Sequence, residues 1–259
     1  MATRAVVTLA AALLLGGCAQ AQETPTADPS APPAETAPAA ELQQTVTALE
    51  QEMNAQIAVV VLTPAGEQAA GSLTPGPAWS TIKVPLAIAA LRADPSLSHL
   101  AGSAITVSDN AAAQQLWDSL GGGAAAAEAV ELVLQESGDN RTQVNEQKTR
   151  PEFSAFGQTT WELADQATFA RHLSASTGAA EIEVRNYMAQ VADSDSYGLG
   201  GLVDAHFKGG WGPDLNGAYL TRQFGYSGDT AIAVATIPAD GSYASGQQVL
   251  SELTRRLNL

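Results

Sequence analysis

Cysteine is almost absent from this 259-residue sequence, because Cys18 is the single one. One thiol excludes an internal disulfide and cannot by itself build a thiolate zinc or iron–sulfur site. Histidine is scarce as well: only His99, His172 and His206 occur, and no H-E-x-x-H spacing is present. We therefore expect neither a metal nor any other cofactor.

Basic residues are few, since 12 Lys and Arg stand against 27 Asp and Glu, which gives a formal net charge of −15. Nucleic acids and anionic membrane surfaces bind clustered Lys and Arg, so this balance argues against both as partners. Apolar residues make up 45% of the chain, enough to bury the core of one large domain. We expect that domain to be a monomer.

Residues 1–17 contain Arg4 and then an apolar run at 5–15, which Gly16, Gly17 and Cys18 follow. Eleven residues are too few to cross a bilayer, which takes about 20, so the run is typical of a signal segment. Small residues before a cysteine resemble the lipobox of bacterial lipoproteins, which implies lipidation of Cys18. We expect an extracytoplasmic protein held by this lipid on the cell membrane, or on an outer membrane if the host has one. An ordinary cleaved signal followed by a stray cysteine is the alternative.

Residues 18–40 are rich in Ala, Pro, Thr and acidic residues. Such a composition buries little and does not repay the entropy of ordering, so we expect a disordered tether. The globular domain is expected at 41–259, where the composition changes.

Helical spacing of apolar residues predicts helices at 42–53, 80–91, 109–120, 124–135, 161–174 and 244–257. β-Branched and alternating runs predict strands at 57–62, 68–73, 203–211, 218–227 and 230–237. Thr159 and Glu162 have the spacing of a capping box, which marks a helix start. Strands at both ends of a helical block predict an α+β fold, with one sheet of about five strands, flanking helices and an all-helical insert.

Ser80 and Lys83 form an S-x-x-K motif at the start of a predicted helix. Three residues along a helix place both side chains on one face. Ser80 would lie at the positive end of the helix, where backbone N–H groups can meet an oxyanion, and a neutral Lys83 amine can take the serine proton. The pattern predicts a nucleophile and its base, whereas a surface serine beside a solvated lysine is the alternative.

Two further motifs follow in the chain. An S-D-N triplet begins at Ser108 and opens a predicted helix, so Ser108 can relay a proton to a leaving group and Asn110 can hold a substrate amide. A K-G-G-W segment begins at Lys208 on a predicted strand, where a backbone N–H can form half of an oxyanion hole and Lys208 can raise the local potential.

The three motifs in this order resemble the serine β-lactamase and penicillin-binding-protein superfamily, and most closely class A β-lactamases. The resemblance covers about residues 57–257 and implies an antiparallel sheet with a helical insert. The roles it implies are a nucleophile at Ser80, a base at Lys83, a proton shuttle at Ser108, substrate ligands at Asn110, Lys208 and Gly210, and an oxyanion hole from the amides of Ser80 and Trp211. It also implies a small-molecule partner, either a β-lactam or a D-Ala-D-Ala-like cell-wall peptide, and no cofactor.

The chain departs from that pattern in three places. Ser80 and Ser108 are only 28 residues apart, so we expect a shortened helical domain. Gly209 stands where the superfamily has Thr or Ser, and Arg222 on the next strand is a candidate replacement for the lost carboxylate-binding hydroxyl. No E-x-x-L-N loop is present in the sequence, and the candidates for a water-activating base are Glu146 and Glu152. We expect weak β-lactam turnover.

Several residues have a structural interpretation beside the functional one. A solvated loop carboxylate is the favoured interpretation of Glu146, and a structural histidine is favoured for His206 over one that borders the cleft. Trp79 and Trp211 flank two motifs and fit either a pocket or the core. At the level of the whole protein, a non-catalytic lipoprotein that uses the scaffold to bind cell-wall fragments or a protein partner is the alternative to a serine hydrolase.

Overall fold

The computed structural model describes residues 37–74 and 76–257. The expected signal segment, Cys18 and most of the expected tether lie outside the described residues. Helix α1 already begins at Ala37, so the last four residues of the expected tether, 37–40, are helical. Within the described ranges, no helix combines the length and the apolar character needed to cross a membrane.

Within the described residues, five strands form a single antiparallel sheet in the order β2-β1-β5-β4-β3. The strands are β1 (Ala55–Thr63), β2 (Gly66–Gly71), β3 (His206–Pro213), β4 (Tyr219–Ser227) and β5 (Thr230–Pro238). The helices are α1 (Ala37–Met53), α2 (Lys83–Ala93), α3 (Ser98–Thr106), α4 (Asn110–Ser119), α5 (Gly123–Glu136), α6 (Leu163–Ala175), α7 (Ala179–Met188) and α8 (Tyr243–Leu257). Pairing of β1 with β5, for example Val59 opposite Val234, joins distant parts of the chain and confirms the predicted α+β sheet.

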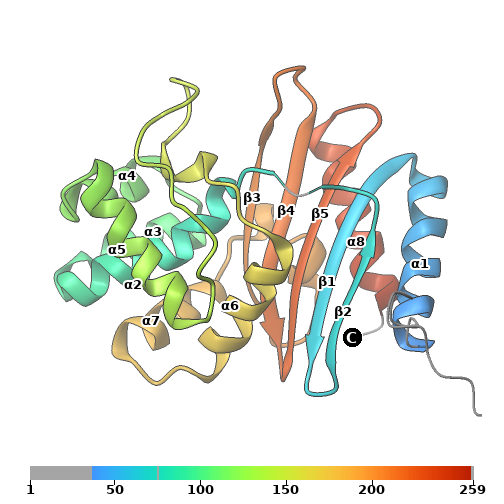
Figure 1. Ribbon diagram of the computed structural model, residues 1–259, viewed down its shortest axis with the longest axis horizontal. Coiled ribbons are helices and arrows are strands. Elements are labelled where there is room, and N and C mark those ends of the chain that lie inside the picture. The colour runs from blue at the N-terminus through green and yellow to red at the C-terminus, as the bar shows by residue number, and fades with distance from the viewer. Residues whose placement is uncertain (1–36, 75, 258–259) are drawn as a thin grey trace, which may run out of the picture. The chain divides into compact units, whose positions relative to one another are not determined.

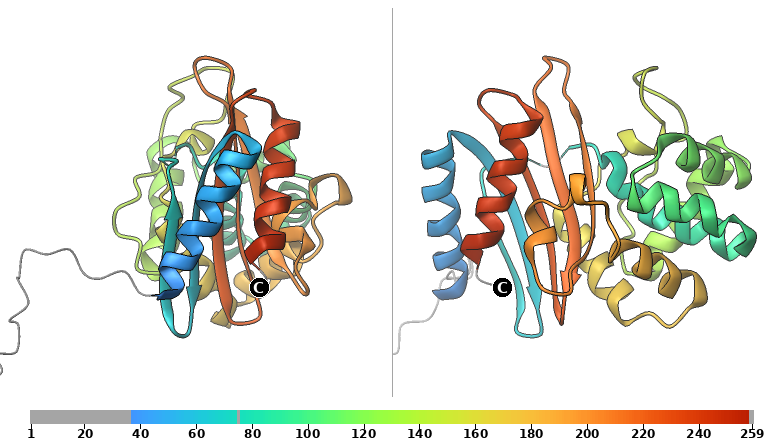
Figure 2. Two further views of the ribbon diagram at one scale, coloured as in Figure 1. Left: turned by 90° about the vertical axis from the view of Figure 1, so that its right-hand side faces the viewer. Right: turned by 180° about the vertical axis from the view of Figure 1, so that it is seen from behind.

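Helices cover both faces of the sheet (Figures 1 and 2). On one face, Val59 of β1 and Val234 of β5 are buried with Leu49 of α1 and Leu250 of α8. Residues that alternate with them point to the other face, because successive side chains of a strand project to opposite sides. The period of two therefore produces two separate cores.

The second core joins the sheet to the helical block of α2 to α7. Its sheet side includes Ala231, Ala233 and Ala235 of β5, and its helix side includes Phe169 and Ala170 of α6. Small side chains on this face of β5 let α6 pack closely against the sheet. Edge strand β3 therefore faces the start of α2. The K-G-G-W segment on β3 and the S-x-x-K motif at the start of α2 meet there.

The sequence analysis missed two helices, α3 and α7, and the capping box is wrong. Helix α6 begins at Leu163 after Glu162, whose side chain makes no capping bond. The hydroxyl of Thr159 instead accepts a hydrogen bond from the backbone N–H of Asn145 at 3.0 Å. A tertiary contact therefore uses the group that the local pattern assigned to a cap.

Candidate active site

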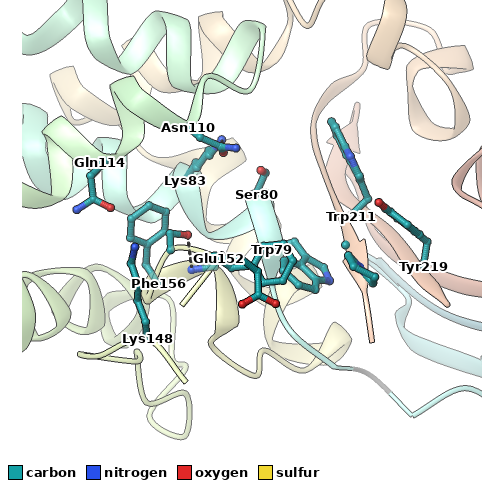
Figure 3. A pocket seen from close by; sticks show the side chains of 15 residues that line it. Trp79, Ser80, Lys83, Asn110, Gln114, Lys148, Glu152, Phe156, Trp211 and Tyr219 are labelled. Atoms are coloured by element: carbon teal, nitrogen blue, oxygen red, sulfur yellow. Dashed lines mark hydrogen bonds between the residues drawn. The ribbon is translucent and has the colours of Figure 1, made fainter. Parts of the chain in front are cut away.

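A cavity of about 330 Å³ lies between β3 and the helical block, and Figure 3 shows Ser80 near its centre. Its lining includes four residues of the predicted motifs, Ser80, Lys83, Asn110 and Trp211. It also includes four further aromatic residues and two charged ones: Trp79, Phe153, Phe156, Tyr219, Lys148 and Glu152. The structure thus brings together motif residues that are more than 100 positions apart in the chain.

Ser80 lies in a short 3₁₀ turn, η1 (Trp79–Ile82), which leads directly into α2 at Lys83. Trp79 has a φ of 51°, a left-handed conformation that costs free energy in a bulky residue. A strained backbone beside a partly exposed serine is typical of a functional turn.

Edge strand β3 runs very close to this turn. A Cβ atom added to Gly210 would stand 2.8 Å from the backbone nitrogen of Ser80 and 2.8 Å from the carbonyl oxygen of Ala78. Only glycine permits that approach. Gly210 does not line the cavity, whereas the neighbouring Trp211 and Ser80 both do.

Lys83 is 1% exposed, and its ammonium has three oxygen partners. It donates hydrogen bonds to the carbonyl oxygen of Ser108 at 2.6 Å and to Oδ1 of Asn110 at 2.7 Å. A longer contact of 3.4 Å reaches Oγ of Ser108. These contacts join the S-x-x-K and S-D-N motifs into one hydrogen-bonded group.

Ser108 stands between α3 and α4 with a φ of 56°, the second left-handed residue of the site. The side chain of Asp109 caps α4 by accepting from the backbone N–H groups of Ala111 and Ala112. That cap fixes the start of α4, so Asn110, the first residue of the helix, lies on the cavity lining.

Lys208 is also 1% exposed, and its ammonium contacts the same serine. It donates to Oγ of Ser108 at 3.0 Å and to the carbonyl oxygen of Gly209 at 2.8 Å. Lys208 is not part of the cavity lining. Its ammonium therefore contacts Ser108 from outside the cavity lining.

Burial of the two ammonium groups disfavours their charged forms, so each is a stronger acid than a lysine in water. Burial, and next the charge of Lys208, lowers the pKa of Lys83 to about 7 from its usual 10.5. Burial lowers the pKa of Lys208 to about 8, against a smaller opposite effect of Asp195. A substantial fraction of Lys83 is consequently neutral at pH 7, the form that can take a proton from a serine.

The two glutamates of the sequence analysis have different positions. Glu146 is exposed and does not line the cavity, so the structure does not bring this candidate base to Ser80. Glu152 does line it and is the single carboxylate among the described lining residues. Its carboxylate pairs with Arg150 at 3.1 Å.

Arg222 cannot replace the hydroxyl that a Thr or Ser would provide at position 209, which corrects the sequence analysis. Its fully buried guanidinium donates to the carbonyl oxygens of Gly76, Pro77 and Trp161 at 2.7–3.0 Å. Sequence reasoning did not consider Tyr197, whose hydroxyl lies close to this position. A Cβ added to Gly209 would stand 3.6 Å from the hydroxyl oxygen of Tyr197.

Aromatic rings line the two sides of the cavity. Trp79 meets Phe153 edge to face at 4.9 Å, and Trp211 stacks on Tyr243 at 4.9 Å. His206 stacks on Tyr226 at 4.7 Å near the other end of β3 and is absent from the lining, which fits its structural interpretation. In the described part of the chain, no cluster of three or more His, Cys, Asp or Glu side chains could hold a metal ion.

Comparisons with solved structures place this fold among class A β-lactamases. An ancestral (GNCA) class A β-lactamase has 21% identity and a TM-score of 0.65, covering 84% of this chain and 98% of its own. The class A β-lactamase of Mycobacterium abscessus has 17% identity and a TM-score of 0.65, with coverages of 84% and 98%. The chromosome-encoded β-lactamase of Vibrio parahaemolyticus has 17% identity and a TM-score of 0.64, with coverages of 83% and 97%.

No curated protein sequence matches the chain. A family model does, and it is described as the Beta-lactamase enzyme family and matches residues 92–243. This range is more than half of the chain and contains the S-D-N and K-G-G-W segments, whereas Ser80 and Lys83 lie ahead of it. On the family match and the shared fold, the chain belongs to the β-lactamase enzyme family, as a class A-like member.

Proposed function

We propose that the protein is a serine hydrolase that forms an acyl-enzyme at Ser80, with β-lactams or D-Ala-D-Ala-like cell-wall peptides as substrates. The observation that carries the proposal is the environment of Lys83. Its buried amine has a pKa lowered to about 7 and lies one helical turn from Ser80, on the same cavity lining. A base of that pKa can act at neutral pH.

In the acylation step, Oγ of Ser80 bonds to the carbonyl carbon of the substrate and passes its proton to Nζ of Lys83. The developing oxyanion accepts hydrogen bonds from the amides of Ser80 and Trp211. When the carbon–nitrogen bond breaks, Ser108 gives its proton to the leaving nitrogen and recovers one from Lys83, to which it is hydrogen-bonded. Lys208, at 3.0 Å from the same hydroxyl, stabilises the charge that Ser108 carries on the way.

Hydrolysis of the acyl-enzyme needs a base for the attacking water. Glu152 takes this role in our proposal, because it is the carboxylate on the described cavity lining. Nothing in the E-x-x-L-N pattern supports it, since the residues after Glu152 are Phe153 and Ser154. Turnover of β-lactams is accordingly slow, and the acyl-enzyme is long-lived.

The lipobox-like segment adds a proposal on location: lipidation of Cys18 anchors the domain outside the cytoplasmic membrane. Cys18→Ala should then release the protein from the membrane fraction or leave it as unprocessed precursor. A variant that is still processed and stays with the membrane would show that another feature anchors it.

Labelling with a fluorescent penicillin and with a fluorophosphonate tests the proposed nucleophile. Both probes should modify the folded chain, and Ser80→Ala should abolish labelling while Ser119→Ala, on the exposed end of α4, should not. Labelling that survives in Ser80→Ala contradicts the proposal. A chain that neither probe labels favours the non-catalytic binding protein.

A further inference from the structure

The two walls of the cavity differ in chemistry. Figure 3 shows Trp211 and Tyr219 on one side of Ser80, and Lys148 on the other. The described lining has three charged side chains, none of which belongs to β3 or β4: Lys83, Lys148 and Glu152. The two halves of a bound substrate therefore meet different surfaces, one aromatic and one charged.

The leaving half of the substrate lies beside β3 in the proposed reaction. Ser108 gives its proton to the leaving nitrogen, and the ammonium of Lys208 holds the hydroxyl of Ser108 at 3.0 Å. Lys208 belongs to β3 and directly precedes Gly209. A leaving nitrogen within reach of Ser108 consequently places the group attached to it against residues 208–211 of β3.

Three aromatic side chains lie on the face of β3 to which position 209 points. A Cβ added to Gly210 would meet the backbone of η1, so the side chains at 209 and 211 project from the opposite face. There, a Cβ on Gly209 would stand 3.6 Å from the hydroxyl of Tyr197, which accepts a hydrogen bond of 3.3 Å from the hydroxyl of Tyr243. The ring of Tyr243 stacks on Trp211, with 4.9 Å between the ring centres. We call Tyr197, Tyr243 and Trp211 the aromatic cluster.

The aromatic cluster carries no charge. Burial raises the pKa of Tyr197 and that of Tyr243, so both hydroxyls stay protonated, and the indole of Trp211 does not titrate. A carboxylate held against such a surface loses its hydration without gaining an ion pair, whereas an ester or an amide has less hydration to lose. The cluster therefore favours a neutral group beside β3.

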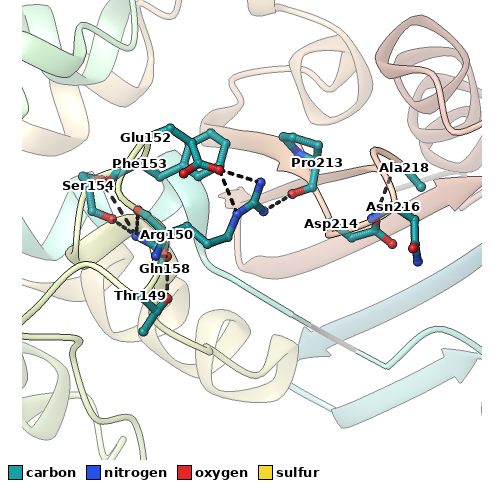
Figure 4. Close-up of polar contacts among 10 residues, drawn as sticks. All are labelled: Thr149, Arg150, Glu152, Phe153, Ser154, Gln158, Pro213, Asp214, Asn216 and Ala218. Atoms are coloured by element: carbon teal, nitrogen blue, oxygen red, sulfur yellow. Dashed lines mark hydrogen bonds and ion pairs between the residues drawn. The ribbon is translucent and has the colours of Figure 1, made fainter.

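Basic side chains on and beside β3 are already bonded to the protein. Lys208 is 1% exposed, and its ammonium contacts two protein oxygens. The guanidinium of Arg222 on β4 is fully buried. Arg150 donates to the carbonyl oxygen of Pro213 at 2.5 Å and to Oε1 of Glu152 at 3.2 Å (Figure 4). These three cations of the described chain therefore have protein partners before a substrate binds.

The charge of the whole chain acts in the same direction. Its formal net charge is −15, so a substrate with a free carboxylate approaches against electrostatic repulsion. A substrate with a neutral leaving half meets less of this repulsion. Long-range and local electrostatics thus favour the same kind of substrate.

We propose that the site selects acyl donors whose leaving half has no free carboxylate, and that the aromatic cluster is the surface which this half contacts. The substrate class is a β-lactam or a D-Ala-D-Ala-like peptide whose carboxylate is esterified or amidated. In the reaction, Oγ of Ser80 bonds to the carbonyl carbon and gives its proton to Lys83, the carbon–nitrogen bond breaks, and the leaving nitrogen takes the proton of Ser108. This inference rests on the proposed function, because it presupposes an acyl-enzyme at Ser80.

Benzylpenicillin and its methyl ester test this selectivity, because they differ only in the methyl group that removes the charge of the leaving half. Intact-mass kinetics give the acylation rate with each compound. Each rate is divided by the rate of alkaline hydrolysis of the same compound, which corrects for its intrinsic reactivity. On this corrected scale, the ester should acylate the unsubstituted chain at least as fast as benzylpenicillin does.

Substitutions at position 209 test the role of this face of β3. Gly209→Thr adds a hydroxyl beside Tyr197 and should shift the corrected ratio toward benzylpenicillin by about 10-fold, since a hydrogen bond to a charged group is stronger than one to a neutral group. Gly209→Ala is the matched control, because it adds the same Cβ without the hydroxyl. It should keep the ratio of the unsubstituted chain.

Trp211→Ala tests the aromatic cluster directly. This substitution removes one ring and keeps the backbone amide, so it should lower acylation by the ester about 10-fold more than acylation by benzylpenicillin. Because the readout is a ratio of two substrates on one variant, a general loss of folded protein does not change it. Thermal unfolding of each variant provides the control for folding.

The outcomes are distinct. Slower corrected acylation by the ester than by benzylpenicillin, equal ratios in Gly209→Thr and Gly209→Ala, or an unchanged ratio in Trp211→Ala would each overturn this inference while leaving the acyl-enzyme in place. An unsubstituted chain that neither compound acylates would instead overturn the proposed function, and this inference with it.

Discussion

Lys83 and Lys208, 125 positions apart in the chain, both reach the hydroxyl of Ser108, at 3.4 Å and 3.0 Å. Both ammonium groups are buried, and the charge of Lys208 adds to the cost of charging Lys83. The S-x-x-K, S-D-N and K-G-G-W segments therefore form one electrostatic unit with Ser108 at its centre. The acid–base behaviour of the site depends on all three segments.

The first prediction concerns pH. Neutral Lys83 is the active form, so acylation of Ser80 should rise with pH through a midpoint near the Lys83 pKa of about 7. The charge of Lys208 helps to lower that pKa, so Lys208→Met should raise it and move the rising limb to higher pH. Single-turnover acylation rates across the pH range provide the measurement. A limb that stays in place or moves to lower pH would show that the two lysines are not coupled.

The second prediction compares two neighbouring glycines. Gly209→Ala should fold and acylate nearly normally, because its Cβ would meet only atoms at 3.6 Å or more. Gly210→Ala should lose most acylation, because its Cβ would stand 2.8 Å from backbone atoms of the turn that holds Ser80. Thermal unfolding together with penicillin labelling tests both variants. Equal effects of the two substitutions would contradict the close approach of β3 to Ser80.

The third prediction concerns Arg222, which the structure assigns to stability and not to substrate binding. Arg222→Ala leaves buried carbonyl oxygens without their donor and should lower the free energy of unfolding by about 3–5 kcal/mol. Arg255→Ala breaks an exposed ion pair on α8, which water screens, and should lower the free energy of unfolding far less. Urea unfolding compares the two. A small loss in Arg222→Ala, combined with weaker penicillin binding, would restore the carboxylate-binding role.

The fourth prediction compares the two loop glutamates. Glu152→Gln should slow decay of the acyl-enzyme by at least about 10-fold, since loss of a catalytic base typically costs 10²–10⁴ in rate. Glu146→Gln should change it little, because Glu146 is exposed and absent from the cavity lining. A pulse of penicillin followed by a mass-spectrometric chase measures both. Fast deacylation that is lost in Glu146→Gln would reverse the assignment.

Sequence reasoning could predict the motif residues because their geometry is local. An S-x-x-K at a helix start places Ser80 and Lys83 on one face, and an S-D-N before a helix supplies its own cap through Asp109. The β-branched run at 57–62 likewise predicted strand β1, in which alternate residues such as Val59 and Val60 lie in different cores. These features depend on neighbours within a few positions.

Features that depend on distant partners could not be predicted. Arg222 is buried because Gly76 and Trp161, 146 and 61 positions away, surround its guanidinium. The 137–162 loop has no helical or strand period, so its sequence does not show that Glu152, and not Glu146, lines the cavity. The hydrogen bond from Arg150 to the carbonyl oxygen of Pro213 belongs to the same class, since it depends on the position of Pro213 at the end of β3.

The most direct test of the account is intact-mass spectrometry of the folded chain after incubation with benzylpenicillin, followed by peptide mapping. We expect a mass increase of one penicillin, located on Ser80, that persists for minutes and is absent from Ser80→Ala. An unmodified chain, or a modification on any other residue, would contradict the central claim that Ser80, served by Lys83, is an acylating nucleophile.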